Sequence, residues 1–169
     1  KTITTGEGGA ILTNDPELAK QIRLRVNHGM TPERPYWHDV VGTNARMTNL
    51  TAAIGTAHVY RWDSLVAARN LVAKKYDERL ADLFANTDLY RRPVASWATE
   101  ATWLYTVAHP NRQPIVDTLR GRGIDARPIW TALCDLPLYR ESCRGDYPVA
   151  RKIAAEAFWL PTWAGMPDT

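Results

Sequence analysis

The apolar positions of the N-terminal half predict helices. Over residues 14–29 they recur every three to four positions, with basic side chains on the other faces, which is the spacing of an amphipathic helix. Asn14 or Asp15 can cap this helix, and Pro16 suits its first turn. Gly29 suits its C-terminal end.

A longer helical pattern follows over residues 48–83. Its apolar positions keep the same spacing over the whole stretch, and no proline interrupts it. Asp63 and Ser64 favour a kink or a new helix start inside the stretch. The pattern therefore predicts a pair of helices that carries the chain from one domain to the next.

The period changes in the C-terminal half, where aromatic and β-branched residues predict strands. The expected strands and helices lie at residues 89–93, 102–107, 112–122, 124–130, 147–158 and 158–161, the third and fifth of these being helices. Strand and helix alternate within a small unit, which is typical of the α+β class. One further apolar run, at residues 10–13, predicts a short buried strand directly after a glycine cluster.

The composition is that of an ordinary globular domain. Of the 169 residues, 45% are hydrophobic and 23% are charged. No segment resembles a signal peptide and no apolar run is long enough to span a bilayer, which predicts a cytoplasmic protein without membrane contact. The two cysteines, Cys134 and Cys143, fit no metal spacing, so reduced thiols and no metal site are expected.

The charge is mildly basic, with a formal net charge of +3. The basic residues are spread along the predicted helices and do not gather in one arm, so this charge does not indicate nucleic-acid binding. Two interpretations of the small arginine clusters remain open. They form solvated surface, or they attract an anionic ligand such as a nucleotide-sugar diphosphate.

Lys1 is the first candidate for chemistry. The first nine residues read Lys-Thr-Ile-Thr-Thr-Gly-Glu-Gly-Gly, and the glycines allow positive φ angles and close backbone approach. A lysine at the mouth of such a turn has a fixed direction, which a lysine that forms an imine with a carbonyl ligand requires. On local physics alone, the alternative is a glycine-rich hairpin with an exposed lysine.

Asn44 and Arg46 are the second candidates. Both precede the predicted helix start at Thr48, where side-chain donors and the partial positive charge of a helix N-terminus favour a phosphate group. The alternative is a capping turn, with Thr48 as the N-cap and Arg46 in a surface ion pair.

The loop of residues 30–43 carries the third candidates, Tyr36 and Trp37. Two prolines argue against regular structure there, and loops of this length in compact domains often carry function. Aromatic side chains on such a loop cover a ligand or a subunit boundary, or they cover the chain's own helix at residues 16–28.

Three segments together resemble the DegT/DnrJ/EryC1/StrS family of sugar aminotransferases. The first is Lys-x-x-Thr-x-Gly-Glu-Gly-Gly, which begins at Lys1. The second is Gly-x-Asn-x-Arg-Met-Thr-x-hydrophobic-x-Ala-Ala, which begins at Gly42. The third is the tail, where Arg-Pro-Ile-Trp at residues 127–130 and Leu-Pro-Leu-Tyr at 136–139 match the family's small domain in outline.

The resemblance implies a fold and a division of the chain. The fold class is α/β, the C-terminal part of a fold type I transferase that depends on pyridoxal phosphate. Residues 1–47 would be a remnant of the large cofactor-binding domain, residues 48–84 the connecting helices, and residues 85–169 a small α+β domain. The family's N-terminal half, which carries the aspartate that pairs with the pyridine nitrogen, and its last helix would lie outside this chain.

The resemblance also implies the chemistry. In the family, the lysine at the position of Lys1 forms the internal aldimine with pyridoxal 5'-phosphate and then moves protons during ping-pong transamination. The segment of Asn44 and Arg46 reaches the cofactor phosphate of a neighbouring subunit, so a homodimer with shared active sites is expected. Tyr36, Trp37 and Trp130 are candidates for substrate binding.

The implied substrates are an amino-acid donor, often glutamate, and a nucleotide-linked keto-sugar. The segment after Lys1 most resembles the branch that aminates 4-keto-6-deoxy sugars, such as the perosamine synthases. In many relatives a histidine that contacts the sugar stands where Cys134 aligns, and here it is missing. A function of another class stays open, namely a non-catalytic half-chain that acts as an interaction module or pseudo-subunit.

Overall fold

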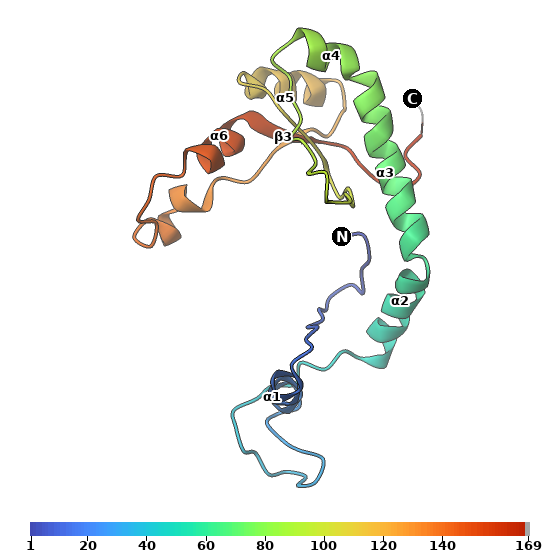
Figure 1. Ribbon diagram of the computed structural model, residues 1–169, viewed down its shortest axis with the longest axis vertical. Coiled ribbons are helices and arrows are strands. Elements are labelled where there is room, and N and C mark those ends of the chain that lie inside the picture. The colour runs from blue at the N-terminus through green and yellow to red at the C-terminus, as the bar shows by residue number, and fades with distance from the viewer. Residues whose placement is uncertain (168–169) are drawn as a thin grey trace. The chain divides into compact units, whose positions relative to one another are not determined.

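The computed structural model describes residues 1–167, which form two compact units. The first unit consists of Lys1 and residues 3–62, and the second contains residues 63–167. Figure 1 follows the chain through its helices and strands from the N-terminus to the C-terminus. The predicted division at residues 47 and 84 stays a prediction.

The N-terminal unit contains α1 (Pro16–Val26) and α2 (Asn49–Tyr60). Asp15 caps α1, and its carboxylate accepts hydrogen bonds from the backbone N–H groups of Glu17 and Leu18, at 2.9 and 3.1 Å. The predicted end at Gly29 is wrong by three residues, because the helix already ends at Val26. Gly29 instead turns the chain with a φ of +75°, and its N–H group bonds back to the carbonyl of Leu24.

The segment before α2 is fastened to the end of α1 by backbone hydrogen bonds. Thr43 N–H donates to the Arg25 carbonyl at 2.8 Å, and Ala45 N–H donates to the Val26 carbonyl at 3.1 Å. Gly42 permits this close approach, because a Cβ atom there would collide with the backbone of residues 25–29. The two ends of the loop at residues 30–43 are therefore held side by side.

The predicted buried strand at residues 10–13 is wrong. This segment is irregular, and the side chains of Ile11 and Leu12 are 68% and 94% exposed. A strand needs a neighbour for its backbone N–H and C=O groups. Within residues 1–167, no strand pairs with this segment.

The long helical stretch is divided into three helices. After α2, the helix α3 runs over Trp62–Arg79 and α4 over Ala81–Asn86. The break after α2 falls at Arg61, two residues before the predicted position at Asp63. The expectation of a helix pair is confirmed, with α4 as an additional short turn of helix.

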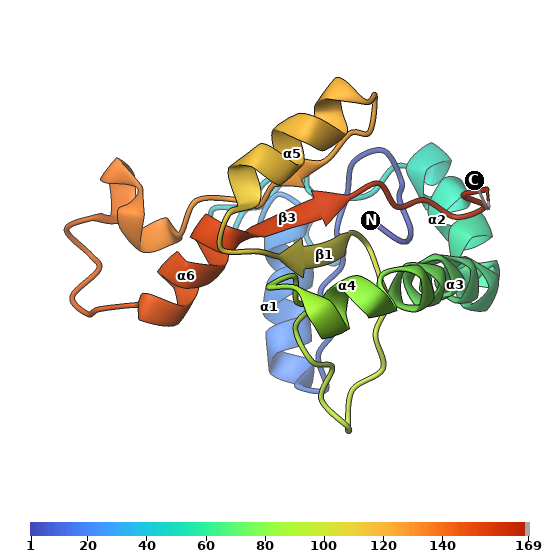
Figure 2. The same ribbon diagram turned by 90° about the horizontal axis from the view of Figure 1, so that it is seen from above.

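The C-terminal unit is built on a small antiparallel sheet. The strands β1 (Tyr105–Ala108), β3 (Ala157–Leu160) and β2 (Arg127–Pro128) lie in the order β1-β3-β2. Figure 2 shows β1 and β3 side by side, with α5 (Arg112–Gly121) running along them. The strands β1 and β2 are shorter than predicted, whereas β3 has the predicted length and begins one residue earlier. Residues 89–93 contribute only an isolated bridge between Tyr90 and Ala108.

Short helices connect the strands of this unit. Two 3₁₀ turns, η1 (Leu133–Asp135) and η2 (Pro137–Tyr139), lie in the segment that the sequence predicts as irregular. The helix α6 (Pro148–Glu156) follows and leads directly into β3. Cys134 is buried in η1, Cys143 is half-buried, and the two are not bonded to each other.

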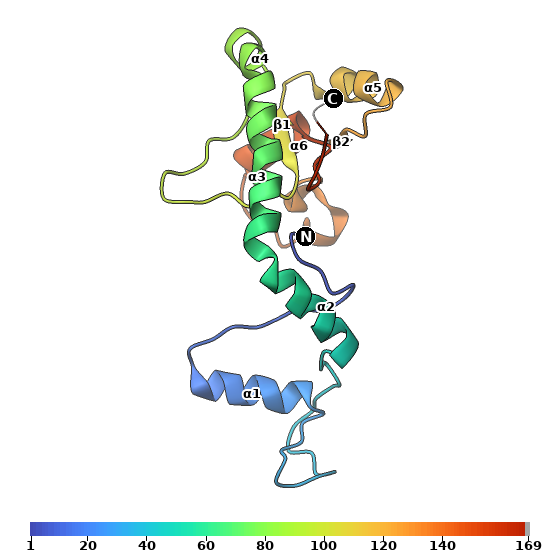
Figure 3. The same cartoon turned by 90° about the vertical axis from the view of Figure 1, so that its right-hand side faces the viewer.

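The core of the C-terminal unit lies between one face of the sheet and the helices α3 and α5. Alternate strand residues point into it, among them Tyr105, Val107 and Phe158, which are at most 2% exposed. Tyr76 of α3 stacks on Tyr105 of β1 with ring centroids 4.6 Å apart. Figure 3 shows α3 running past β1.

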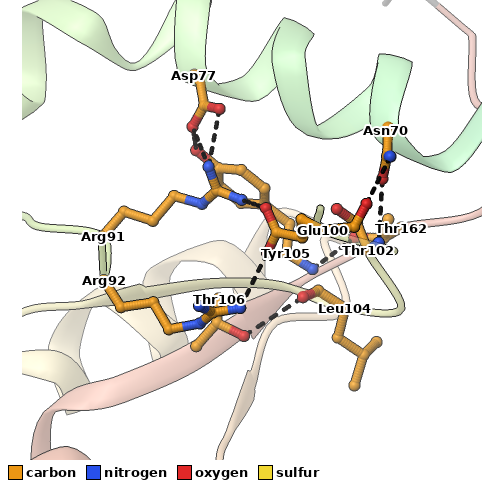
Figure 4. A network of polar contacts seen from close by, with 10 residues as sticks. All are labelled: Asn70, Asp77, Arg91, Arg92, Glu100, Thr102, Leu104, Tyr105, Thr106 and Thr162. Carbon is orange, nitrogen blue, oxygen red and sulfur yellow. Dashed lines mark hydrogen bonds and ion pairs between the residues drawn. The ribbon is translucent and has the colours of Figure 1, made fainter. Parts of the chain in front are cut away.

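Polar contacts also join α3 to the sheet (Figure 4). The guanidinium of Arg91 donates to the carboxylate of Asp77 on α3 at 2.9 Å and to that of Glu100 at 2.6 Å. The hydroxyl of Tyr105 donates to the same Asp77 at 2.6 Å. Burial and this hydrogen bond raise the pKa of Tyr105 above its usual value, so the phenol stays protonated.

None of the described helices is both long enough and apolar enough to cross a membrane. The described residues also form no cluster of histidine, cysteine and carboxylate side chains that could hold a metal ion.

Candidate functional site

Lys1 lies on the wall of a cavity in the N-terminal unit. The cavity has a volume of about 810 Å³. The backbone of residues 3–10 forms one wall, and side chains of α2 form the other, including Ala52, Val59 and Tyr60. The lysine and the glycine cluster that follows it are therefore brought together at a space large enough for a small ligand.

Thr5 fits the lysine segment against α2. A Cβ atom at Gly55 would lie 2.9 Å from Cγ2 of Thr5, and a Cβ atom at Gly8 would lie 2.9 Å from its Oγ1. The same hydroxyl donates to the carbonyl of Glu7 at 2.7 Å. Thr5 is thus held between two glycines, which fixes the position of the loop that follows Lys1.

Sequence reasoning missed the roles of Thr5 and Gly55. A signal was present, because a glycine inside a helix costs about 1 kcal/mol relative to alanine and needs a packing reason. Gly55 is the only glycine within α2.

This packing predicts opposite effects of two glycine substitutions. We expect Gly55→Ala to lower the melting temperature of the protein, because the new methyl group pushes Thr5 away. We expect Gly121→Ala in α5 to raise it, because a Cβ atom there has open space and alanine is the better helix former. Thermal unfolding followed by circular dichroism measures both.

Removing the methyl group of Thr5 is the control. In the double variant Thr5→Ser with Gly55→Ala, the clash with Cγ2 is gone, so most of the lost melting temperature should return. If Gly55→Ala stabilises the protein as much as Gly121→Ala does, Thr5 does not hold the loop against α2.

Asn44 and Arg46 form a pair on the surface just before α2. The Nε of Arg46 donates to Oδ1 of Asn44 at 3.1 Å. Asn44 is held in place by its bridge to Asn27, next to the end of α1. The amide nitrogen of Asn44 and the terminal nitrogens of Arg46 are donors of the kind that bind phosphate oxygens.

Thr48 caps α2, as the sequence predicts. Its Oγ1 accepts a hydrogen bond from the N–H group of Thr51 at 3.3 Å. The capping interpretation therefore holds for Thr48, whereas no ion pair of Arg46 occurs among the described residues. The lining of the Lys1 cavity includes neither Asn44 nor Arg46.

Tyr36 and Trp37 are exposed on their loop. Trp37 donates from its Nε1 to the carboxylate of Asp39 at 2.9 Å, and the guanidinium of Arg34 lies 4.1 Å from the centre of its ring. Tyr36 is 90% exposed and has a φ of +64°. A ring this exposed does not cover α1, so that alternative does not fit Tyr36.

Trp130 lies in the C-terminal unit, in a cluster with two other tryptophans. Its ring is 4.6 Å from that of Trp159 and meets it edge-on, and it is 6.1 Å from that of Trp103. Its side chain is nevertheless 66% exposed. The three rings line a separate cavity of about 570 Å³.

Comparison with protein families gives one match over the entire chain. The model of the DegT/DnrJ/EryC1/StrS aminotransferase family matches residues 1–169. A GDP-perosamine synthase from Caulobacter vibrioides is 38% identical over 99% of the chain. A GDP-perosamine synthase from Vibrio cholerae is 31% identical, also over 99%. The chain spans 46% of the length of each relative.

Solved structures of sugar aminotransferases have the same fold. The aminotransferase TlmJ from Streptoalloteichus hindustanus superposes with a TM-score of 0.87 and 24% identity, over 99% of this chain and 45% of its own. DesV from S. venezuelae, solved with a ketimine intermediate, gives a TM-score of 0.78 and 29% identity over 93% of this chain and 42% of its own. The expected α/β fold, the C-terminal part of a fold type I transferase, is confirmed.

Proposed function

Because the chain belongs to the DegT/DnrJ/EryC1/StrS aminotransferase family, we propose that the protein transfers an amino group from an amino acid to a nucleotide-linked keto-sugar. Glutamate is the proposed donor. The observation that carries the proposal is the position of Lys1, which lines a ligand-sized cavity beside its glycine loop. A 4-keto-6-deoxy sugar is the proposed acceptor, and the GDP-perosamine synthases among the relatives support this choice.

The residues of the N-terminal unit fit pyridoxal 5'-phosphate, the cofactor of this family. A primary amine, at Lys1, lines a cavity of about 810 Å³, within the size range of cofactor sites. Gly8 leaves the loop backbone open where a side chain would meet Thr5. When bound, pyridoxal phosphate supplies an electron sink for the carbon that gains or loses the amino group.

The residues of the chain would bind the cofactor, orient the reacting amine and transfer protons. Lys1 would hold the cofactor, and its Nζ, once displaced by the amino donor, would carry a proton to or from the reacting carbon. Thr5 fixes the loop that aims this amine, so its packing against Gly55 contributes to positioning. Ala52, Val59 and Tyr60 of α2 give the cavity an apolar wall opposite the glycine loop.

Asn44 and Arg46 are the proposed phosphate donors, and they would act in a second copy of the chain. They do not line the cavity of Lys1 in their own unit. Their mutual hydrogen bond fixes the direction of the guanidinium and still leaves amide and terminal N–H donors for an anion. We therefore propose a homodimer in which each site takes its lysine from one subunit and its phosphate donors from the other. The proposed location of this dimer is the cytoplasm.

Shared sites predict complementation between two inactive variants. Arg46→Ala and Lys1→Ala should each be inactive alone. In a mixed dimer, one of the two sites combines an intact Lys1 with an intact Arg46, so about half of the mixed dimer's sites regain turnover. The measurement is amino transfer after subunit exchange.

The control mixes two batches of the same variant, which should stay inactive. Absence of recovery in a population proven by mass spectrometry to contain mixed dimers would contradict shared sites.

Tyr36, Trp37 and Trp130 are proposed to contact the substrate. The support for the two loop residues is that both are exposed, Trp37 to 52%. The hydrogen bond to Asp39 and the contact with Arg34 hold the ring of Trp37 in place. Rings held in this way present an apolar surface at little cost in conformational entropy.

A coupled assay tests the function. The full-length protein is incubated with pyridoxal phosphate, glutamate and a GDP-linked 4-keto-6-deoxy sugar, and the formation of 2-oxoglutarate is measured. We expect 2-oxoglutarate in proportion to aminated sugar. If neither product forms while pyridoxal phosphate also fails to bind, the non-catalytic alternative, an interaction module or pseudo-subunit, replaces this proposal.

A further inference from the structure

A loop forms one wall of the tryptophan cavity, the cavity of about 570 Å³ that is lined by Trp103, Trp130 and Trp159. The loop covers residues 92–101 and carries a further tryptophan, Trp97. Figure 3 shows this loop, in yellow-green, projecting away from α3 and β1. The cavity therefore has a wall that belongs to no helix or strand.

Both ends of this loop are anchored. The carboxylate of Glu100, near the end of the loop, accepts hydrogen bonds from Arg91 at 2.6 Å and from Arg92 at 3.1 Å. The side chain of Asn70 on α3 donates to the carbonyl of Glu100 at 2.6 Å and accepts from the N–H group of Thr102 at 3.1 Å. These contacts hold the two ends of the loop together and fasten them to α3 (Figure 4).

The middle of the loop has no such anchors. Every residue from 93 to 99 is exposed, and Trp97 is 88% exposed. Among residues 1–167, the one backbone hydrogen bond made by residues 93–99 lies inside the loop, from the N–H group of Ala98 to the carbonyl of Ala95 at 2.9 Å. A segment with few contacts between two fixed ends can move without disturbing the fold around it.

The exposed middle of the loop is also apolar. Residues 93–98 include no charged side chain, and burying the indole of Trp97 would be favourable. Across the cavity, Trp130 is 66% exposed. Trp159 meets Trp130 edge-on, at an interplanar angle of 76°, so a flat face of Trp130 is left for another ring.

We propose that residues 93–99 are a lid that closes over the tryptophan cavity when substrate is bound, with Trp97 moving towards Trp130. The occupant rests on the proposed function, in which Trp130 contacts the nucleotide-linked sugar. The anchored ends at Glu100 and Asn70 act as the hinge, because a lid loop moves between ends that stay fixed. Closure buries the indole of Trp97 and retains the ligand in the cavity.

Hydrogen exchange of the full-length protein tests the proposal. Exchange at residues 93–99 is measured by mass spectrometry with and without saturating GDP-mannose, a nucleotide-linked sugar that has no keto group. Calorimetry measures its binding. We expect the bound sugar to slow this exchange by about fivefold or more, because closure protects the loop from water. The loop of residues 140–146 is the control, because it is largely exposed in the same unit and does not line the cavity.

Substitution of Trp97 distinguishes a closing lid from a rigid wall. Trp97→Ala should abolish the slowing of exchange and raise the Kd for GDP-mannose by roughly threefold to tenfold, the range of one lost aromatic contact. Trp97→Phe keeps a ring and should restore both. Trp163→Ala is the matched control, because this half-exposed tryptophan lines a different cavity.

Three results would overturn the lid. They are unchanged exchange at residues 93–99 with GDP-mannose bound, the same slowing in Trp97→Ala as in the wild type, and no binding of GDP-mannose at all. If the protein transfers amino groups while this exchange stays unchanged, the lid fails and the proposed function stands. If GDP-mannose slows the exchange but no keto-sugar is aminated, the proposed function fails and the lid stands.

Discussion

Replacing Lys1 by alanine is expected to reduce turnover by roughly a thousandfold or more, the range of a lost general acid–base group. The structure gives two reasons. Lys1 contributes a primary amine to the wall of its cavity, and the loop that carries it is held against α2 by Thr5. Because the lysine is exposed, the substitution should leave the melting temperature nearly unchanged.

Borohydride reduction distinguishes loss of chemistry from loss of cofactor. In the wild type loaded with pyridoxal phosphate, reduction should attach the cofactor permanently to the peptide that contains Lys1, and peptide mass mapping detects it. The Lys1→Ala variant should carry no such adduct. Lys20→Ala, which removes an exposed lysine from α1, is the matched control and should behave as the wild type. Full turnover in Lys1→Ala would rule out the proposed role of this residue.

Local sequence signals predicted the helices well, because each depends on residues close in the chain. Asp15 caps α1 and Thr48 caps α2, as their side chains and positions indicate. The strands were less predictable. Residues 10–13 have the composition of a buried strand but are exposed, since a strand also depends on a neighbour that the local sequence does not contain.

In the candidate site, too, residues in local motifs could be predicted, and residues that act through distant contacts could not. Lys1, Asn44 and Arg46 could be selected from the sequence, because each lies in a short segment that resembles the family. Thr5 could not, since its importance comes from a contact with Gly55, fifty positions further along the chain. Trp130 was a candidate from the sequence, but its cluster with Trp103 and Trp159 was not predictable, because the three rings come from three separate segments. Only the folded chain brings such residues together.

Arg91 ties α3 to the segment before β1 through two ion pairs. Arg91 is 17% exposed and contacts two carboxylates, those of Asp77 and Glu100, which are 42% and 24% exposed. The guanidinium also lies 4.8 Å from the centre of the Tyr105 ring. Removing this one cation leaves the Asp77 carboxylate with the hydroxyl of Tyr105 and the Glu100 carboxylate with the more exposed Arg92, so two partly buried negative charges lose their shared cation.

We expect Arg91→Met to lower the free energy of unfolding by about 2–3 kcal/mol, below the value for a fully buried pair because Asp77 is partly exposed to solvent. Urea unfolding followed by circular dichroism measures this. Arg127→Met is the matched control, because Arg127 also bonds a carboxylate, that of Asp125, but both side chains are nearly two-thirds exposed. Water already solvates that pair, so its loss should have little effect. Equal destabilisation by the two substitutions would show that the burial of Arg91 does not strengthen its ion pairs, and would contradict this prediction.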